Sequence, residues 1–235
     1  LGLAVPVDRQ TLTRRLHACL AKNGRRDAVL RLSLSRGISG RGLATAGCTD
    51  PTLLILCFPP RRYPPQMLAE GAHVILASVR RTPAAALDPL AKTANYLNNI
   101  LAFREAEMQG AAEALMLNTA GELAEGAVSN LFLVRDGALW TPALACGVMA
   151  GVTRAAVLEV AGTTGIDARE ARLYPQDLAS ADEAFFTNTT AAVMPIGLVD
   201  GYCYAAPGPV TQTLRAGLLA LIQREAGRFW PADAE

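Results

Sequence analysis

Residues 121–142 read GELAEGAVSNLFLVRDGALWTP and contain two short apolar runs separated by an Asp-Gly pair. The runs occupy residues 130–134 and 138–141, and Asp136-Gly137 between them is a strong short-range signal of a β-hairpin. A further apolar run at 113–118 favours another strand close to this hairpin. The stretch therefore predicts a sheet of short strands joined by tight turns.

The segments outside this stretch alternate between helical and strand patterns. Apolar residues recur at helical spacing in four segments, 8–23, 95–110, 152–160 and 210–229, the third of which is expected to be stopped by Gly162 and Gly165. Runs rich in Leu, Ile and Val predict strands at 28–35, 51–58, 73–79 and 183–187. Because strands and helices are interspersed, we predict the α/β (α+β) fold class.

A proline- and alanine-rich segment, residues 80–90, has the composition of an interdomain linker. We place a domain boundary there. The chain is thereby divided into a small N-terminal α/β domain at 1–85 and a larger C-terminal domain at 86–235.

Composition excludes several classes of protein. Of the 235 residues, 51% are hydrophobic, which is enough to bury a sizeable core and argues against disorder. The net charge of +1 leaves no global field that would hold a nucleic acid. Charges or prolines interrupt each apolar stretch before the ~20 residues that span a bilayer, and no signal-like segment opens the chain. We expect no nucleic-acid or membrane partner and a cytoplasmic location.

The cysteines and histidines give no metal or disulfide pattern. The five cysteines are scattered without a C-x-x-C pair, at Cys19, Cys48, Cys57, Cys146 and Cys203. His17 lies on the first predicted helix and His73 begins a predicted strand, so neither is a candidate base. We predict no metal site.

Lys92, in the segment LAKTANYL at 90–97, is a candidate amine. It precedes Tyr96 and Leu97 at the edge of an apolar surface, where desolvation makes a lysine a usable nucleophile. The alternative is a surface lysine whose stem covers apolar neighbours.

Glu125 stands among small residues directly before Gly126. A carboxylate in such surroundings can approach a planar ring at its edge and hold a ring nitrogen protonated. The alternative is an acid in a surface turn.

Two further segments have the character of anion sites. Gly151 precedes the start of a predicted helix, so the N–H groups of Val152 and Thr153 could receive a phosphate. Residues 187–192, TNTTAA, end a predicted strand and could form a second nest. Threonines are also ordinary at helix starts and in turns. An amine, a ring-nitrogen carboxylate and two phosphate cradles together are what pyridoxal 5'-phosphate requires.

The same segments carry a resemblance to a known family. The matching motifs are Ala91-Lys92-Thr93-x-Asn95-Tyr96-Leu97, Glu125-Gly126 with Ser129-Asn130-Leu131-Phe132, Thr141-Pro142, Gly151-Val152-Thr153-Arg154 and Thr187-Asn188-Thr189. Their order and spacing along the chain resemble the class IV (fold type IV) pyridoxal-phosphate enzymes. These include branched-chain and D-amino acid aminotransferases, (R)-amine transaminases and 4-amino-4-deoxychorismate lyases.

The resemblance implies a role for each matching residue. Lys92 forms the Schiff base with the cofactor and moves a proton at the substrate Cα. Glu125 pairs with the pyridine nitrogen, and Tyr96 lies beside the phenolic oxygen. The implied cofactor-binding set is Lys92, Tyr96, Glu125, Ser129, Asn130, Val152, Thr153 and Thr189, and Thr190 and Ala191 face the substrate carboxylate. Arg154 fits its motif but is as readily a helix-surface residue, so we assign it no catalytic role.

The segment SLSRGISGRGL at 33–43 bears on the subgroup. Arg41-Gly42-Leu43 supplies an arginine without the histidine of the Arg-x-His loop of D-amino acid aminotransferases. The pair Arg36 and Arg41 is more similar to the cationic loop of aminodeoxychorismate lyases, which suits a dicarboxylate substrate. The sequence thus favours a lyase that releases 4-aminobenzoate and pyruvate, and a class IV aminotransferase is the alternative.

The family carries further residues before the point that matches Leu1. We therefore expect a truncated N-terminal small domain, and an inactive truncated homologue is a third reading of the sequence. The resemblance also implies a small-molecule amino substrate and a homodimer.

Overall fold

A computed structural model describes residues 1–40 and 42–229 of the chain. It divides into two compact units, Leu1–Arg62 and Tyr63–Glu235. The division lies upstream of the boundary that the sequence predicts near residue 85. The reason is that strand β3, Ala72–Leu76, pairs with β4 and β10 of the larger unit.

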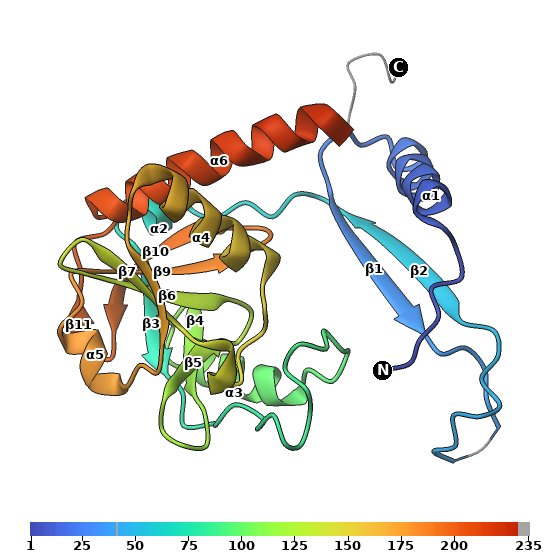
Figure 1. Ribbon diagram of the computed structural model, residues 1–235, viewed down its shortest axis with the longest axis horizontal. Helices are drawn as coiled ribbons and strands as arrows, with labels where there is room; N and C mark the ends of the chain where they lie inside the picture. Colours follow the sequence, from blue (N-terminus) through green and yellow to red (C-terminus); the bar gives the residue numbers. More distant parts are fainter. Residues whose placement is uncertain (41, 230–235) are drawn as a thin grey trace. The chain divides into compact units, whose positions relative to one another are not determined.

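The smaller unit contains helix α1, Arg9–Lys22, and strands β1, Val29–Ser35, and β2, Thr52–Phe58 (Figure 1). The Asp8 carboxylate accepts a hydrogen bond from Thr11 N at 2.6 Å and so begins the helix, as its capping preference predicts. The two strands pair antiparallel along their whole length. The helix and both strands expected in this part of the sequence are confirmed.

The larger unit is built on a mixed sheet. Within the described residues it has nine strands in the order β11-β10-β3-β4-β5-β6-β7-β8, with β9 pairing both β10 and β6. The remaining bounds are β4 Glu113–Leu117, β5 Leu123–Gly126, β6 Asn130–Arg135, β7 Ala138–Pro142, β8 Ala168–Ala171, β9 Glu183–Asn188, β10 Ala192–Val199 and β11 Tyr202–Cys203. β3 runs parallel to β4 and β10, β7 runs parallel to β8, and the other pairs are antiparallel.

Helices cover this sheet. Their bounds are α2 Pro65–Ala69, α3 Leu97–Met108, the 3-10 helix η1 Leu144–Cys146, α4 Val152–Thr164, α5 Pro175–Ala179 and α6 Pro209–Phe229. α4 and α6 pack against each other and against β9 (Figure 1). α3 packs on β3 and β4 through the buried alanines Ala102 and Ala106.

Alternation along the strands separates the core into two faces of the sheet. On β6, Leu131 and Leu133 enter one buried cluster, whereas Phe132 and Val134 enter the cluster beneath α4 and α6. Phe132 stacks on Phe185 of β9 with ring centroids 5.0 Å apart. The strand that carries the candidate Asn130 is therefore buried on both faces.

The predicted hairpin is confirmed. β6 and β7 are joined at Asp136 and Gly137, whose φ angles of 52° and 75° are the positive values that such a turn needs. The helix predicted at 152–160 differs at its end. Of the two glycines expected to stop it, Gly162 lies inside the helix, whereas Gly165, with its left-handed φ of 74°, ends it.

The sequence patterns did not predict β5, β8, β10, β11, α2 or α5, which are short or lack a clean period. β10 contains a proline and a glycine, Pro195 and Gly197, which weaken a strand pattern.

Candidate active site

Lys92 lies in the irregular segment that leads into α3. Its Nζ donates a hydrogen bond to the Tyr96 Oη at 2.8 Å, and it also lies 3.9 Å from the Met149 Sδ. The side chain of Lys92 is exposed and that of Tyr96 is half-buried. The amine is thus held by the tyrosine that the sequence motif places four residues further along.

Glu125 is a buried carboxylate that accepts hydrogen bonds from three residues. Its Oε1 accepts from Arg81 Nε at 2.8 Å, and its Oε2 accepts from Met149 N at 2.8 Å and Asn130 Nδ2 at 3.2 Å. Burial raises the pKa of Glu125, and the charges of Arg81 and Lys92 act against that rise. The carboxylate therefore sits in a desolvated site whose cations favour its ionised form.

Met149 joins the two halves of this site. Its thioether lies beside Lys92, its backbone N–H donates to Glu125, and its carbonyl accepts from Asn130 Nδ2 at 2.9 Å. The structure therefore brings together Lys92, Tyr96, Glu125 and Asn130, four of the residues to which the sequence assigns the cofactor.

Sequence reasoning missed Met149 and Arg81. Met149 lies in a loop without a pattern, and Arg81 falls in the segment that was interpreted as a linker. The ion pair of Arg81 with Glu125 joins residues 44 positions apart. No local signal could have found it.

The start of α4 is open to an anion. The helix begins at Val152 after Gly151, and no side chain of the described residues caps it. A Cβ at position 151 would lie 2.1 Å from the Asn130 Oδ1, so only glycine allows the loop this close to Asn130. Val152 is exposed and Thr153 half-buried, so the first turn can offer its N–H groups and a hydroxyl.

The end of β9 supplies a second polar group. Thr187 pairs with Asn130 in the β6–β9 register, and its buried Oγ1 has no hydrogen-bond partner among the described residues. Thr189, two residues on, is exposed. An uncapped helix start and a buried, unpartnered hydroxyl opposite Asn130 fit the phosphate of pyridoxal 5'-phosphate.

The donors predicted for the substrate carboxylate are engaged within their own turn. The Asn188 Oδ1 accepts from Thr190 N at 3.0 Å, from the Thr190 Oγ1 at 3.1 Å and from Ala191 N at 2.8 Å. The Thr190 Oγ1 also lies 2.9 Å from the Tyr63 Oη. A substrate carboxylate would have to compete with Asn188 for these groups.

Two residues of the matching motifs are placed differently from expectation. Ser129 is buried and its Oγ donates to Glu113 at 3.0 Å, away from Glu125. Arg154 is not on the helix surface: it is buried, and its Nη2 lies 2.8 Å from Glu170 and 3.0 Å from the Pro142 carbonyl oxygen. The ion pair joins α4 to β8, and the hydrogen bond joins it to the end of β7.

The loop arginines belong to the smaller unit. The Arg36 guanidinium donates to the carbonyl oxygens of Leu1 at 2.5 Å and Gly2 at 3.3 Å, so it is occupied by the backbone. Arg41, the other predicted substrate-binding arginine, lies outside the described residues.

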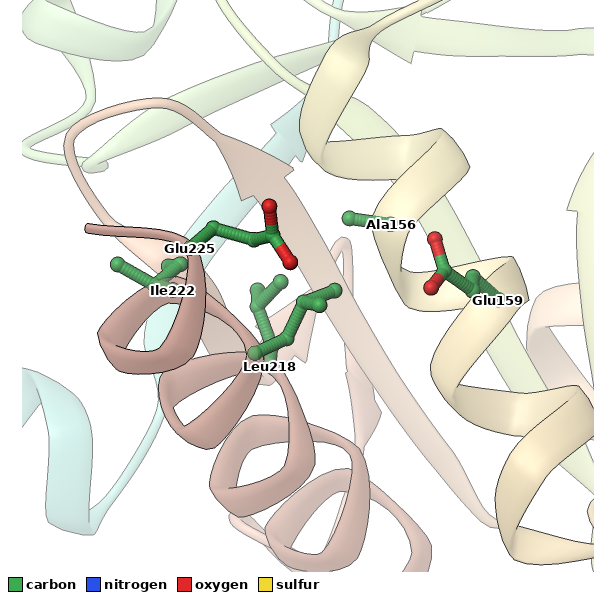
Figure 2. A pocket seen from close by; sticks show the side chains of 6 residues that line it. Ala156, Glu159, Leu218, Ile222 and Glu225 are labelled. Carbon is green, nitrogen blue, oxygen red and sulfur yellow. The ribbon is translucent and has the colours of Figure 1, made fainter. Parts of the chain in front are cut away.

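A groove of about 470 Å³ runs between α4 and α6 (Figure 2). Glu159 of α4 and Glu225 of α6 flank an apolar floor that includes Leu218. None of the predicted site residues lines this groove.

Residues 1–40 and 42–229 contain no cluster of three or more His, Cys, Asp or Glu that could hold a metal ion. Among the helices described, none is both long enough and apolar enough to cross a membrane.

Comparisons with known proteins identify relatives of this chain. A branched-chain-amino-acid aminotransferase of Pseudomonas aeruginosa is 32% identical over 236 residues, which cover 98% of this chain and 76% of the relative. An aminodeoxychorismate lyase of Bacillus subtilis is 29% identical over 237 residues, covering 98% and 80%. The solved structure of a branched-chain aminotransferase from the archaeon Thermoproteus uzoniensis, with norvaline, has a TM-score of 0.88 at 31% identity, covering 98% of this chain and 76% of that one.

The family model for amino-transferase class IV matches residues 1–199. Enzymes of this class depend on pyridoxal phosphate, so the fold, the enzyme class and the cofactor predicted from the sequence are confirmed. From its site and from these matches, the chain belongs to the class IV aminotransferase family.

Proposed function

We propose that this chain is a pyridoxal-phosphate-dependent aminotransferase for small amino acids of the branched-chain type. One observation carries the proposal. The Lys92 amine is hydrogen-bonded to the Tyr96 hydroxyl, and in the same site the Glu125 carboxylate accepts hydrogen bonds from Met149 N and the Asn130 amide. The choice of substrate is supported by the relatives named above, since the branched-chain aminotransferase is the more similar of the two curated proteins.

Each residue of the site has a task in such a reaction. The cofactor, when bound, supplies an electron-withdrawing ring that acidifies the substrate Cα. The Lys92 amine carries the cofactor and then moves the proton at Cα, while the Tyr96 hydroxyl keeps that amine in place. Glu125 holds a proton on the ring nitrogen, and Arg81 keeps Glu125 ionised for this purpose.

The phosphate group would bind at the start of α4, away from the ring-nitrogen end of the site. The first N–H groups of α4, with Thr153, receive two negative charges at the positive end of the helix. The buried Thr187 hydroxyl of β9 and Thr189, just beyond the end of that strand, are further donors. Asn130, held between Glu125 and Gly151, connects this end to the ring-nitrogen end.

A lyase that converts 4-amino-4-deoxychorismate to 4-aminobenzoate and pyruvate is the second candidate. It rests on the arginines at 36 and 41 and on the 29% identical relative from Bacillus subtilis. Arg36, however, already donates to two backbone carbonyl oxygens. One purified sample assayed for pyruvate release from aminodeoxychorismate and for amino transfer from leucine to 2-oxoglutarate separates the two candidates.

The cofactor proposal is tested by titration with pyridoxal 5'-phosphate, followed by visible absorbance and borohydride reduction. Lys22 and Lys92 are the only lysines of the sequence, so the control variant is simple. We expect the bound-cofactor band in the wild type and in Lys22→Ala, and its absence in Lys92→Ala. Binding that survives in Lys92→Ala and stays reducible would contradict the assignment.

We also propose that the protein is a homodimer in which a second copy covers α3. This helix exposes an apolar stripe of Leu97, Ile100, Leu101 and Met108, with exposed fractions of 64%, 59%, 44% and 78%. These residues recur at helical spacing on the face opposite Ala102 and Ala106, so nothing in the sheet covers them. The cytoplasmic location remains a prediction.

A further inference from the structure

Glu113 is a buried carboxylate that the proposed reaction does not use. It stands at the start of β4 and accepts four hydrogen bonds. Its Oε1 accepts from Ala114 N at 3.0 Å and Ala127 N at 3.1 Å, and its Oε2 accepts from Val128 N at 3.4 Å and the Ser129 Oγ at 3.0 Å. Three of the four donors belong to one turn, residues 126–129.

This turn is wrapped tightly around the carboxylate. A Cβ at Gly126 would lie 2.1 Å from the Ser129 Oγ and 3.2 Å from the Glu113 Cδ. From the outside, Asn99 of α3 donates to the Ala127 carbonyl oxygen at 2.7 Å. The turn is therefore fixed from both sides, and its inner side depends on one acidic group.

The turn also joins the two residues that form the ring-nitrogen end of the site. Glu125 precedes it, Asn130 follows it, and the two face each other as the one paired position between β5 and β6. The Asn130 amide donates to the Glu125 Oε2 across that pair. A change in the turn must change the distance and angle between these two side chains.

We propose that Glu113 is a positioning residue that fixes the Gly126–Ser129 turn and thereby the placement of Glu125. Ser129 accordingly acts as a donor to Glu113, which explains why its hydroxyl is directed away from Glu125. This inference rests on the proposed function, because Glu125 matters as the partner of the cofactor's ring nitrogen.

Glu113 differs from other buried acids in that it binds the turn between Glu125 and Asn130. The chain also contains a buried acid that can serve as a control. Glu183 is also buried, and it too accepts hydrogen bonds from backbone N–H groups, those of Val210 and Thr211. It is the first residue of β9, and its carboxylate accepts these hydrogen bonds from the first turn of α6 and not from the candidate active site. Replacement of Glu183 should lower the free energy of unfolding without changing the position of Glu125.

The first experiment uses the cofactor-free protein and the ¹³C NMR signal of the Glu125 carboxyl, assigned through its loss in Glu125→Gln. In Glu113→Gln we expect the titration midpoint of Glu125 to rise by about one pH unit, because a loosened turn weakens the hydrogen bond by which Asn130 favours the carboxylate. In Glu183→Gln the midpoint should stay at the wild-type value. A midpoint that falls or stays in Glu113→Gln, or that rises equally in Glu183→Gln, overturns the proposal.

The second experiment measures the affinity for pyridoxal 5'-phosphate by titration. Glu113→Gln should weaken binding about tenfold, the size of one lost charge-assisted hydrogen bond, and Glu113→Asp should recover part of it. If Glu113→Gln does not fold, both experiments can be made with Ser129→Ala, which keeps the Glu113 carboxylate and removes one of its hydrogen-bond donors. If the wild type does not bind the cofactor, the proposed function is wrong. The NMR experiment would still test whether Glu113 positions Glu125.

Discussion

At the scale of single residues, the site depends on two buried carboxylates, Glu113 and Glu125. Burial raises the pKa of both Glu113 and Glu125 above the ordinary value of 4.5. The folded state then binds protons more tightly than the unfolded chain does. These two groups therefore favour folding at acidic pH, and that contribution is lost as the pH rises through their raised pKa values.

The positive charge of Arg81 reduces the stability that is lost at Glu125 when the pH rises. Removing Arg81 should therefore destabilise the protein. Glu125 is buried and Arg81 is largely so, with 6% and 11% of their side chains exposed, so Arg81→Met removes the ion-pair partner of a buried carboxylate. We expect a loss of about 3 kcal/mol near neutral pH and a smaller loss near pH 4.5, where Glu125 can be protonated. Urea unfolding at the two pH values measures the difference.

Arg224→Met is the control for this prediction. Arg224 and Glu225 form an exposed pair 3.6 Å apart, so its loss should cost less than about 1 kcal/mol at either pH. An equal loss at both pH values in Arg81→Met would show that Arg81 contributes packing and no charge compensation.

At the scale of elements, α6 is attached to the sheet by its N-terminus. Glu183, at the start of β9, accepts from Val210 N at 3.0 Å and Thr211 N at 2.8 Å, so one carboxylate satisfies two N–H groups of the first turn. A Cβ at Gly208 would lie 2.1 Å from the Glu183 Cδ, which explains the glycine before this helix.

We predict that Glu183→Ala lowers the free energy of unfolding by about 2 kcal/mol, because two N–H groups in the first turn of α6 lose their capping carboxylate. Gly208→Ala should destabilise the protein as well, since it pushes the carboxylate out of place. Glu159→Ala, an exposed change on α4, should stay within about 0.5 kcal/mol. Denaturant midpoints measure all three, and an unchanged midpoint in Glu183→Ala would remove the role of this cap.

At the scale of the whole molecule, the exposed stripe of α3 is the feature that predicts assembly. We expect the wild type to have twice the mass of one chain in light scattering after size exclusion, and Ile100→Glu to have the mass of one chain. A charge in an apolar interface loses its hydration without gaining a partner. Leu219→Glu, at a half-exposed position on α6, should leave the dimer intact; a monomeric wild type would contradict the proposal.

Cofactor binding should also stabilise the whole molecule. At a pyridoxal 5'-phosphate concentration of about 100 times Kd, linkage predicts a gain of about 2.7 kcal/mol in the free energy of unfolding. Removing the cofactor by dialysis should reverse the gain, and Lys92→Ala should show much less of it. Thermal unfolding with and without cofactor checks this, and an equal gain in Lys92→Ala would indicate binding that does not use the lysine.

Several features of this protein can be predicted from the sequence because they depend on adjacent residues. The Asp136-Gly137 turn, the Asp8 cap and the uncapped start of α4 after Gly151 each depend on conformational preferences of a few adjacent residues. Lys92 and Tyr96 are neighbours on one short segment, so their contact also follows from the chain itself.

Other features exist only because distant segments meet. Arg81 reaches Glu125 across 44 positions, Met149 joins Lys92 to Glu125, and Glu113 holds a turn that begins at Gly126. Arg154, expected as readily on the helix surface, is buried because Glu170 lies beside it. Charges that are neutralised by partners far along the chain leave no periodic or compositional trace, so tertiary packing alone decided where they lie.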